Sequence, residues 1–256
     1  MRDYLWAGPV GRIRIIEKGL LTRSDLAKVL DAGSLEAALM ALRDSFYGPY
    51  VSRLENADMF EVALQEAIKD AHDKVMKLAP EPLVIAAYRA RYDFHNLKVL
   101  LKAEMLQVPA EEGAYSRLGN LTPGDLIRVA EAARQGEAPV APGELEPDSI
   151  AESVYKVTCE LAAVYTQVLA QAGTRRLSSF EVDGLIDKSY YAWAASVYNK
   201  SGYDALVEII RSEIDIINLK MAVRAHLMGI SSSDFAGILI PGGYIATAEL
   251  AEGYSK

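Results

Sequence analysis

Residues 89–103, R-A-R-Y-D-F-H-N-L-K-V-L-L-K-A, decide the fold class, because residues 211–225, R-S-E-I-D-I-I-N-L-K-M-A-V-R-A, repeat their pattern. Both stretches follow R-x3-D-x2-N-L-K-x3-[KR]-A. Residues three or four positions apart lie on one face of an α-helix, so the pattern predicts two equivalent helices. The residues that match at an offset of 122 are Arg89 and Arg211, Asp93 and Asp215, Asn96 and Asn218, Leu97 and Leu219, Lys98 and Lys220, Lys102 and Arg224, and Ala103 and Ala225.

The remainder of the chain also has helical periodicity. From Ser34, a predicted N-cap, the apolar residues Leu35, Leu39 and Leu42 fall on one helix face. A second apolar pattern begins near residue 58 and stops at Pro80, because proline cannot continue a helix. Alternating patterns of the strand type are almost absent. The sequence therefore predicts an all-α fold built from duplicated helical-bundle units.

The internal repeat and the prolines predict three parts. Residues 1–107 form a first helical unit, residues 108–149 a Pro/Gly-rich connection with one short helix at 123–135, and residues 150–256 a second helical unit. Two weaker sequence matches support the duplication. They match Gly119, Leu121, Pro123 and Gly124 to Gly237, Leu239, Pro241 and Gly242 at an offset of 118, and Leu42, Asp44 and Tyr47 to Leu185, Asp187 and Tyr190 at an offset of 143.

Composition excludes several classes of function. The 256 residues carry 27 Lys and Arg against 35 Asp and Glu, a net charge of −8, which argues against a nucleic-acid partner. Cys159 is the single cysteine, so the chain has no internal disulfide and no thiolate zinc site. No apolar run approaches the ~20 residues of a membrane helix, and no signal-peptide pattern occurs. We expect a cytoplasmic chain without a cofactor, peripheral to any membrane.

The repeated Asp and Asn allow two interpretations. The structural one is that Asp93 with Asn96, and Asp215 with Asn218, bind the end of a neighbouring helix or turn and fix its position. The chemical one is a carboxylate site for a metal or for acid–base catalysis. Neither copy supplies a second clustered carboxylate or a histidine at ligand spacing, so the structural interpretation is favoured, with Arg89 and Arg211 as part of the repeat.

The same two stretches carry a basic stripe. Its members recur at spacings of three and four, as residues on one helix face do. Ordinary solvated charges are the alternative to a surface that contacts a partner. The candidate partner-contact residues are Arg91, Lys98 and Lys102 with His95 beside them, Lys220 and Arg224 in the second copy, and Arg12 and Arg14 near the start.

Catalytic motifs are weak or missing in the sequence. His72-Asp73 resembles the dipeptide of metal-dependent phosphohydrolases, but His95 and His226, the other histidines, both follow it. Neither E-x-x-H nor the phosphate-binding G-x4-G-K-[ST] occurs. Cys159 lies in an apolar helical stretch and is favoured as a core residue. The 14 tyrosines, many of them in the second half, suit either an interface or the rim of a bundle core. We expect no enzymatic activity.

Taken together, five segments resemble the C subunit of the archaeal and bacterial A/V-type ATPases, the relative of the d subunit of the eukaryotic V-ATPase. Their order and spacing extend over nearly the whole chain. The segments are Arg12-Ile13-Arg14 with Leu20-Leu21, Asp44-Ser45-Phe46-Tyr47, Tyr92-Asp93-Phe94-His95-Asn96-Leu97-Lys98, Asp215-Ile216-Ile217-Asn218-Leu219-Lys220, and Ile240-Pro241-Gly242-Gly243.

The resemblance implies a funnel-shaped, all-helical protein of three similar units. Such a protein binds the membrane rotor ring and receives the central-stalk subunits on the cytoplasmic side, so that ATP synthesis or hydrolysis is coupled to proton or sodium transport. The family pattern continues for about a third unit after Gly243, whereas this sequence ends 13 residues later, so we expect most of that unit to be missing. The alternative is a helical-repeat protein–protein adaptor unrelated to rotary ATPases.

Overall fold

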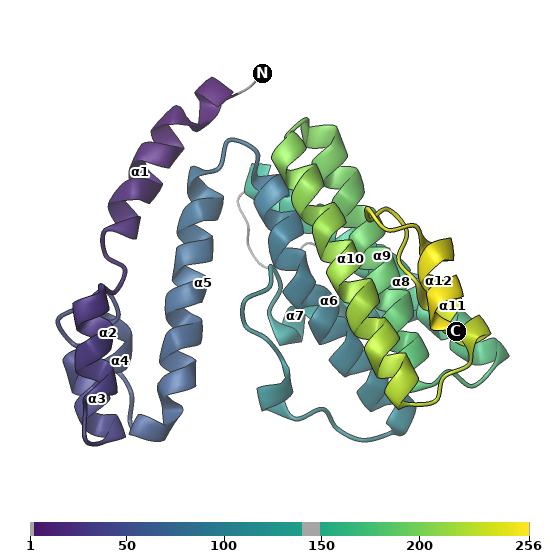
Figure 1. Ribbon diagram of the computed structural model, residues 1–256, viewed down its shortest axis with the longest axis horizontal. Helices are drawn as coiled ribbons and strands as arrows, with labels where there is room; N and C mark the ends of the chain where they lie inside the picture. The colour runs from purple at the N-terminus through teal and green to yellow at the C-terminus, as the bar shows by residue number, and fades with distance from the viewer. Residues whose placement is uncertain (1–2, 140–148, 256) are drawn as a thin grey trace. The chain divides into compact units, whose positions relative to one another are not determined.

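The computed structural model describes residues 3–139 and 149–255 (Figure 1). Helices make up 76% of the chain and no strand occurs in the described residues, which confirms the all-α prediction. The elements are η1 (Asp3–Trp6), α1 (Ala7–Glu17), α2 (Arg23–Leu30), α3 (Leu35–Ala41), α4 (Gly48–Val51), η2 (Ala57–Met59), α5 (Phe60–Leu78), α6 (Pro82–Leu106), η3 (Glu112–Ala114), α7 (Pro123–Gln135), α8 (Ser149–Thr174), α9 (Ser179–Ser201), α10 (Asp204–Leu227), α11 (Ser232–Ile238) and α12 (Thr247–Tyr254).

The chain divides into two compact units, residues 1–85 and residues 86–256. We call them the N-terminal unit and the C-terminal unit. This division follows spatial compactness, whereas the predicted division into 1–107, 108–149 and 150–256 follows the sequence repeat, and the latter stays a prediction. The short helix expected at 123–135 is α7. Residues 140–148 of the predicted connection lie outside the described residues.

The N-terminal unit has a small apolar core beneath short helices. The predicted cap Ser34 accepts a hydrogen bond from the Ala37 backbone N–H and begins α3. On α4 the Tyr50 hydroxyl donates to Asp70 Oδ2 of α5 at 2.7 Å, which joins these two helices. The buried core residues are Leu42, Tyr50, Val51, Ala63 and Ala67, with Leu21, Val29, Leu39, Phe46, Tyr47 and Leu54 packed against them.

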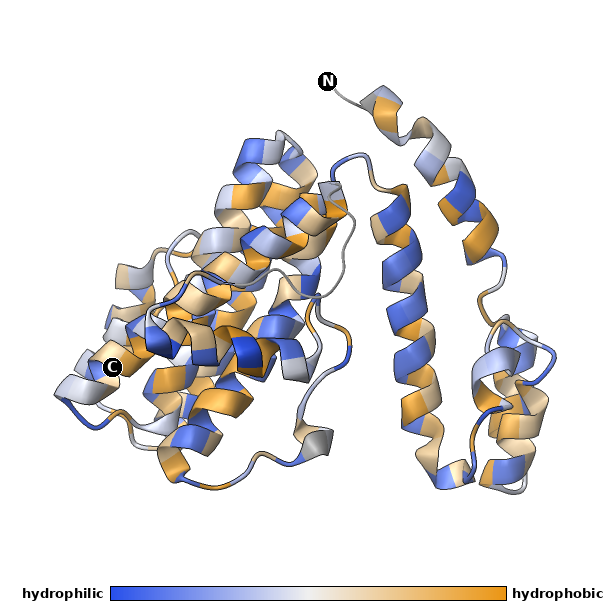
Figure 2. Cartoon of the chain, turned by 180° about the vertical axis from the view of Figure 1, so that it is seen from behind, coloured by the Kyte–Doolittle hydropathy of each residue, from blue (hydrophilic) through white to orange (hydrophobic). Residues whose placement is uncertain are grey.

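The C-terminal unit contains most of the buried residues. Helices α7 and α9 pack against α8, and α10 and α11 pack against α9. The Phe94 ring of α6 contacts Tyr190 and Trp193 of α9, with ring centroids 5.3 and 6.5 Å apart. Figure 2 shows hydrophobic and hydrophilic residues interspersed along these helices. The core of this unit is therefore a helical bundle with α6, α8 and α9 at its centre.

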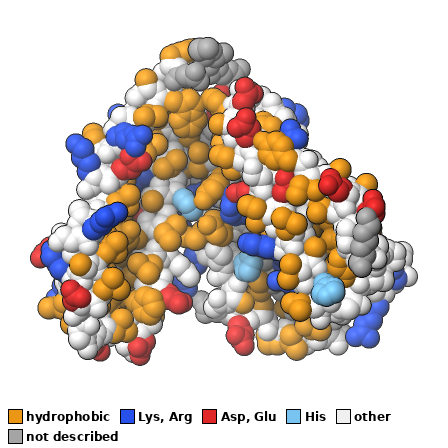
Figure 3. All heavy atoms as spheres, in the orientation of Figure 1, with side chains coloured by type: hydrophobic (Ala, Val, Ile, Leu, Met, Phe, Trp, Pro, Cys, Tyr) orange, Lys and Arg blue, Asp and Glu red, His pale blue; other side chains and the backbone are white. Residues whose placement is uncertain are grey.

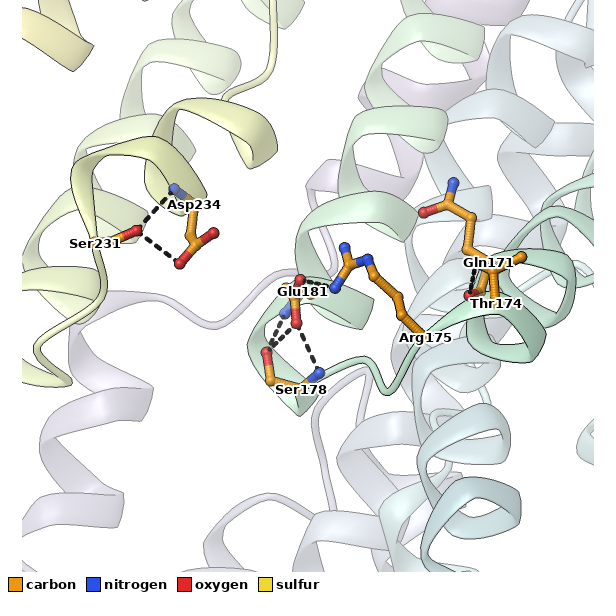
Figure 4. Close-up of polar contacts among 7 residues, drawn as sticks. All are labelled: Gln171, Thr174, Arg175, Ser178, Glu181, Ser231 and Asp234. Atoms are coloured by element: carbon orange, nitrogen blue, oxygen red, sulfur yellow. Dashed lines mark hydrogen bonds and ion pairs between the residues drawn. The ribbon is translucent and has the colours of Figure 1, made fainter.

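Local side-chain hydrogen bonds set several helix boundaries. Ser178 begins α9 by accepting from the Glu181 N–H, and the Glu181 carboxylate accepts from the Ser178 N–H at 2.8 Å. Arg175 donates to the same carboxylate at 2.5 Å (Figure 4). Ser231 begins α11 by accepting from the Asp234 N–H at 3.2 Å, and its hydroxyl donates to the Asp234 carboxylate at 2.7 Å. Gly202 ends α9 with a φ of 74°, which glycine adopts without strain.

None of the helices described in 3–139 and 149–255 combines the length and the apolarity needed to cross a membrane.

Candidate functional site: the repeated Asp–Asn sites and the basic stripe

Polar side chains of α6 hold the loop between η3 and α7. The backbone N–H groups of Asn120 and Leu121 each donate to the Asp93 carboxylate at 2.9 Å, and the Asn120 side chain adds a third bond at 2.7 Å. Arg89 donates to the carbonyl oxygens of residues 118 and 119 at 3.2 and 2.6 Å. The carboxylate thus binds the donors of the loop, and the guanidinium binds its acceptors.

Asn96 completes this arrangement one helical turn further along α6. Its Oδ1 accepts from the Ser116 N–H at 2.8 Å, and its Nδ2 donates to the Ser116 carbonyl at 2.9 Å. An amide side chain that pairs with both backbone groups of one residue imitates a strand partner and fixes that residue's orientation. We call the three side chains on α6, with the loop at 116–121, repeat site 1.

The second copy has the same chemistry on α10. The Asp215 carboxylate accepts from the Tyr244 N–H at 2.9 Å and from the Ile245 N–H at 3.1 Å. Asn218 accepts from the Ile240 N–H at 2.9 Å and donates to the Ile240 carbonyl at 2.8 Å. Arg211 lies 3.5 Å from a carbonyl oxygen of the same loop. We call these side chains, with the loop at 240–245, repeat site 2.

The hydrogen bonds correct the predicted match between the two loops. The loop residues bound by the two sites are 124 positions apart, so Gly119 corresponds to Gly243 and not to Gly237. A Cβ atom at Gly119 would lie 2.2 Å from Asp93 Oδ1, and one at Gly243 would lie 2.0 Å from Asp215 Oδ1. Gly237 lies inside α11 with no atom near a Cβ. The predicted offset of 118 between these loops was wrong, because it aligned identical residue types and not the residues that make equivalent backbone contacts.

The two repeat sites differ in burial. Arg89, Asp93 and Asn96 are all buried, whereas Arg211 is exposed and Asp215 is half-buried. Burial raises the pKa of Asp93 to about 6, against the opposing effects of the backbone hydrogen bonds from the loop and of the Arg89 charge. Repeat site 1 is therefore enclosed within its unit. In repeat site 2 only Asn218, at 0% exposure, is buried, and the Arg211 and Asp215 side chains reach the surface.

The chemistry of both sites is that of loop fixation. Each carboxylate accepts two backbone N–H groups of its own loop, so both of its oxygens take part in holding that loop. In the part of the chain that the structure describes, no group of three His, Cys, Asp or Glu residues is placed to hold a metal ion. The single cysteine, Cys159, is half-buried in α8.

Three members of the basic stripe form ion pairs inside the C-terminal unit. Their partners lie on neighbouring helices, and the side chains of each pair are less than one third exposed. Their charges are balanced within the chain, which limits what they offer to a partner. The ion pairs are Arg91 with Glu213 of α10 at 3.2 Å, Lys98 with Asp187 of α9 at 2.5 Å, and Lys102 with Asp183 of α9 at 2.6 Å.

The other four candidate contact residues are exposed. Arg14 pairs with Glu17 one turn away on α1. Arg12 lines an open groove between α1 and α5, together with Lys74 and Lys77. On α10, Lys220 is exposed, and Arg224 lies 3.9 Å from Asp183. The stripe is thus divided between an internal set on α6 and an exposed set on α1 and α10.

Sequence reasoning missed the acidic partners of the stripe. Asp183 and Asp187 are four residues apart on α9, which is also the spacing of Lys98 and Lys102 on α6. That equal spacing was a usable signal for two facing helices. The contact of Glu104 with Arg134 at 2.8 Å had no comparable signal, because these residues lie on elements joined by a long loop.

The fold and the two repeat sites define the class of protein. It is a helical scaffold in which duplicated polar sites fix loops and ion pairs join helices. Within that class, the sequence matches a family model, ATP synthase (C/AC39) subunit, over residues 9–255. The chain belongs to this family.

Curated relatives agree with the family. The C subunit of the A-type ATP synthase of Pyrococcus horikoshii is 25% identical, over 94% of this chain and 62% of its own length. The protein of the same name from Methanocaldococcus jannaschii is 25% identical, over 91% and 57%. The C subunit of the V-type sodium ATPase of Enterococcus hirae is 24% identical, over 95% and 67%. The chain thus spans less than two thirds of the length of the first two relatives.

Proposed function

We propose that the chain is a non-catalytic coupling component of a rotary A/V-type ATPase. In this proposal it links the membrane rotor ring to the central-stalk subunits on the cytoplasmic side, and so couples ATP synthesis or hydrolysis to ion transport. The observation that carries the proposal is the family match over residues 9–255. The names of the relatives, which come from an ATP synthase and from a sodium ATPase, support the same role.

The architecture suits the transmission of torque. A coupling component must resist deformation between its two partners, and packed helices with cross-linking polar contacts provide such stiffness. The ion pairs from α6 to α9 and the loops held by the two repeat sites are contacts of this kind. We also propose that the parts at 1–107 and 150–256 are copies of one helical unit.

The exposed cations are proposed as partner contacts. Arg12 and Arg14 in the N-terminal unit, and Lys220 and Arg224 in the C-terminal unit, present charge to solvent. Because exposed charge pairs are screened by salt, association through them should weaken as ionic strength rises. This dependence distinguishes a charged contact from an apolar one.

The test is coelution in size-exclusion chromatography with the central-stalk subcomplex, and separately with detergent-solubilised rotor ring, from the same organism. We expect coelution at low salt that weakens at high salt, and weaker coelution for the variant Arg12→Glu/Arg14→Glu. The matched control is Lys156→Glu, which changes an exposed cation on α8 outside the candidate set. A folded, helical chain that coelutes with neither partner at low salt would contradict the proposal.

A further inference from the structure

Equivalent faces of α6 and α10 differ sharply in burial. Four apolar residues along one face of α6 are all 1% exposed or less, whereas their counterparts 122 positions later are about half exposed. Sequence equivalence therefore does not extend to a shared environment. The pairs are Ala87 at 0% and Ile209 at 53%, Phe94 at 1% and Ile216 at 52%, Leu97 at 0% and Leu219 at 47%, and Leu101 at 0% and Val223 at 62%.

These exposed residues lie along one face of α10. They recur at spacings of seven, three and four, and Leu227, which is 80% exposed, continues the stripe by another turn. We call Ile209, Ile216, Leu219, Val223 and Leu227 the α10 face. Apolar side chains appear over α10 on the surface seen in Figure 3, with cations beside them. A contiguous apolar stripe with a polar border is typical of a surface that binds another helix.

The packing of α6 shows what kind of helix fits such a face. Helix α9 covers α6 with the aromatic rings of Tyr190 and Trp193 against Phe94. The Tyr190 hydroxyl also lies 3.4 Å from the Ala87 carbonyl. On the border of this contact, two α9 carboxylates four residues apart pair with two α6 lysines four residues apart. The contact thus combines an aromatic stripe with a matched ladder of charges.

The α10 face keeps both halves of this recognition surface. The counterparts of Lys98 and Lys102 are Lys220 and Arg224, again four residues apart and exposed. Arg224 makes one long contact, 3.9 Å to Asp183. The α10 face therefore carries the apolar stripe and the pair of cations to which α9 is complementary on α6, but no helix described in the C-terminal unit covers it.

We propose that the α10 face binds an amphipathic helix of another polypeptide, which carries two carboxylates four residues apart beside an aromatic stripe. The carboxylates pair with Lys220 and Arg224, and the aromatic residues cover Ile216, Leu219 and Val223. The inference rests on the internal repeat and on the packing of α6 against α9, and it does not depend on the rotary function.

The experiment uses the full chain and a fluorescent, helix-stabilised peptide with the sequence of residues 179–201, which is α9 itself. Fluorescence anisotropy should show saturable binding with one peptide per chain. Val223→Asp should weaken binding about tenfold or more, because it buries a charge in the contact. Leu30→Asp is the matched control: Leu30 is 83% exposed on α2, and this change should leave the affinity unaltered.

A charge exchange tests the pairing itself. A peptide with the two carboxylates changed, Asp183→Lys/Asp187→Lys, should bind the unaltered chain about tenfold more weakly, and the Lys220→Asp/Arg224→Asp chain should restore the affinity. Circular dichroism establishes that each variant is folded, which is expected because all the changed residues of the chain are exposed. Absence of binding to the folded chain, no loss with Val223→Asp, or a dimer of the chain formed through this face would overturn the proposal.

Discussion

Asp93 shows how one buried carboxylate can connect the stability of this protein to pH. Its burial raises its pKa to about 6, against 3.8 for an ordinary Asp side chain. The folded chain therefore holds this proton more tightly than the unfolded chain does. The stabilising contribution of the protonated group is complete below pH 3.8 and is lost as the pH rises through 6.

We expect the free energy of unfolding of the chain to contain a component that falls between about pH 4 and pH 6.5, on the order of 3 kcal/mol in total. Asp93→Asn should lack this component, because asparagine does not titrate in this range. Urea unfolding of both proteins across the pH range measures the difference, and carbon-13 NMR of the Asp93 carboxyl locates the pKa directly. Parallel pH profiles of the two proteins would show that Asp93 does not titrate in this way.

The two loop glycines are required by the space that the carboxylates occupy. Gly119→Ala and Gly243→Ala should each lower the free energy of unfolding by about 2 kcal/mol, because the new methyl group displaces a hydrogen-bonded carboxylate. Gly173→Ala, in α8 with open space around it, is the control and should stabilise by about 0.5 kcal/mol. Chemical denaturation measures all three. Equal stability of the wild type and the two loop variants would mean that the loops move freely.

At the scale of elements, the contact between α6 and α9 depends on charges that are partly removed from water. Lys98 and Asp187 are each about one fifth exposed and 2.5 Å apart. Burial raises the pKa of Asp187 even though Lys98 and Lys102 favour its charged form. Removal of the lysine alone would leave this carboxylate without its strongest partner, so the pair is more sensitive than an ion pair on the surface.

Lys98→Met should destabilise the chain by about 2 kcal/mol near pH 7, and by less in acid, because burial raises the pKa of Asp187 and protonation removes its unpaired charge. The double variant Lys98→Met/Asp187→Leu should recover most of the loss, because no unpaired charge remains. Lys156→Met, which breaks the exposed pair with Glu152, serves as the control with no measurable loss. Equal losses of stability in the single and the double variant would contradict this prediction.

At the scale of the whole molecule, buried residues are unevenly shared. Helices α1, α2 and α3 contain no buried residue, whereas α8 contains nine, among them Val157 and Leu161 at 0% exposure. Local stability follows the number of buried contacts that must break when a segment opens. The first helices of the N-terminal unit should therefore open far more often than the centre of the C-terminal unit.

Hydrogen exchange of the full chain, read by mass spectrometry, should show this gradient. Amides in α1 to α3 should exchange at least about a hundredfold faster than those in α6 and α8. If α1 to α3 were as protected as α8, another surface would have to cover them in solution. The same experiment with the proposed stalk partners present would then report which of these helices becomes protected.

Much of the architecture could be predicted from local sequence. Helical periodicity predicts the all-α class, proline and the turn residues predict α7 at 123–135, and Ser34 before an apolar run predicts a cap. These features depend on neighbours within a few residues, which the sequence displays directly. The repeat of Asp93 and Asn96 in Asp215 and Asn218 is visible for the same reason.

Only the tertiary structure decided the remaining features. Three of these features involve residues far apart in the chain: the match of Gly119 to Gly243, the pairing of Lys98 with Asp187, and the burial of Arg89 and Asp93 where Arg211 and Asp215 reach the surface. Helices α6 and α10 carry the same motif but differ in environment. Helix α9 covers the apolar face of α6, whereas the equivalent face of α10 is exposed to solvent. Burial is set by what packs against a helix, and a helix's own sequence does not contain that information.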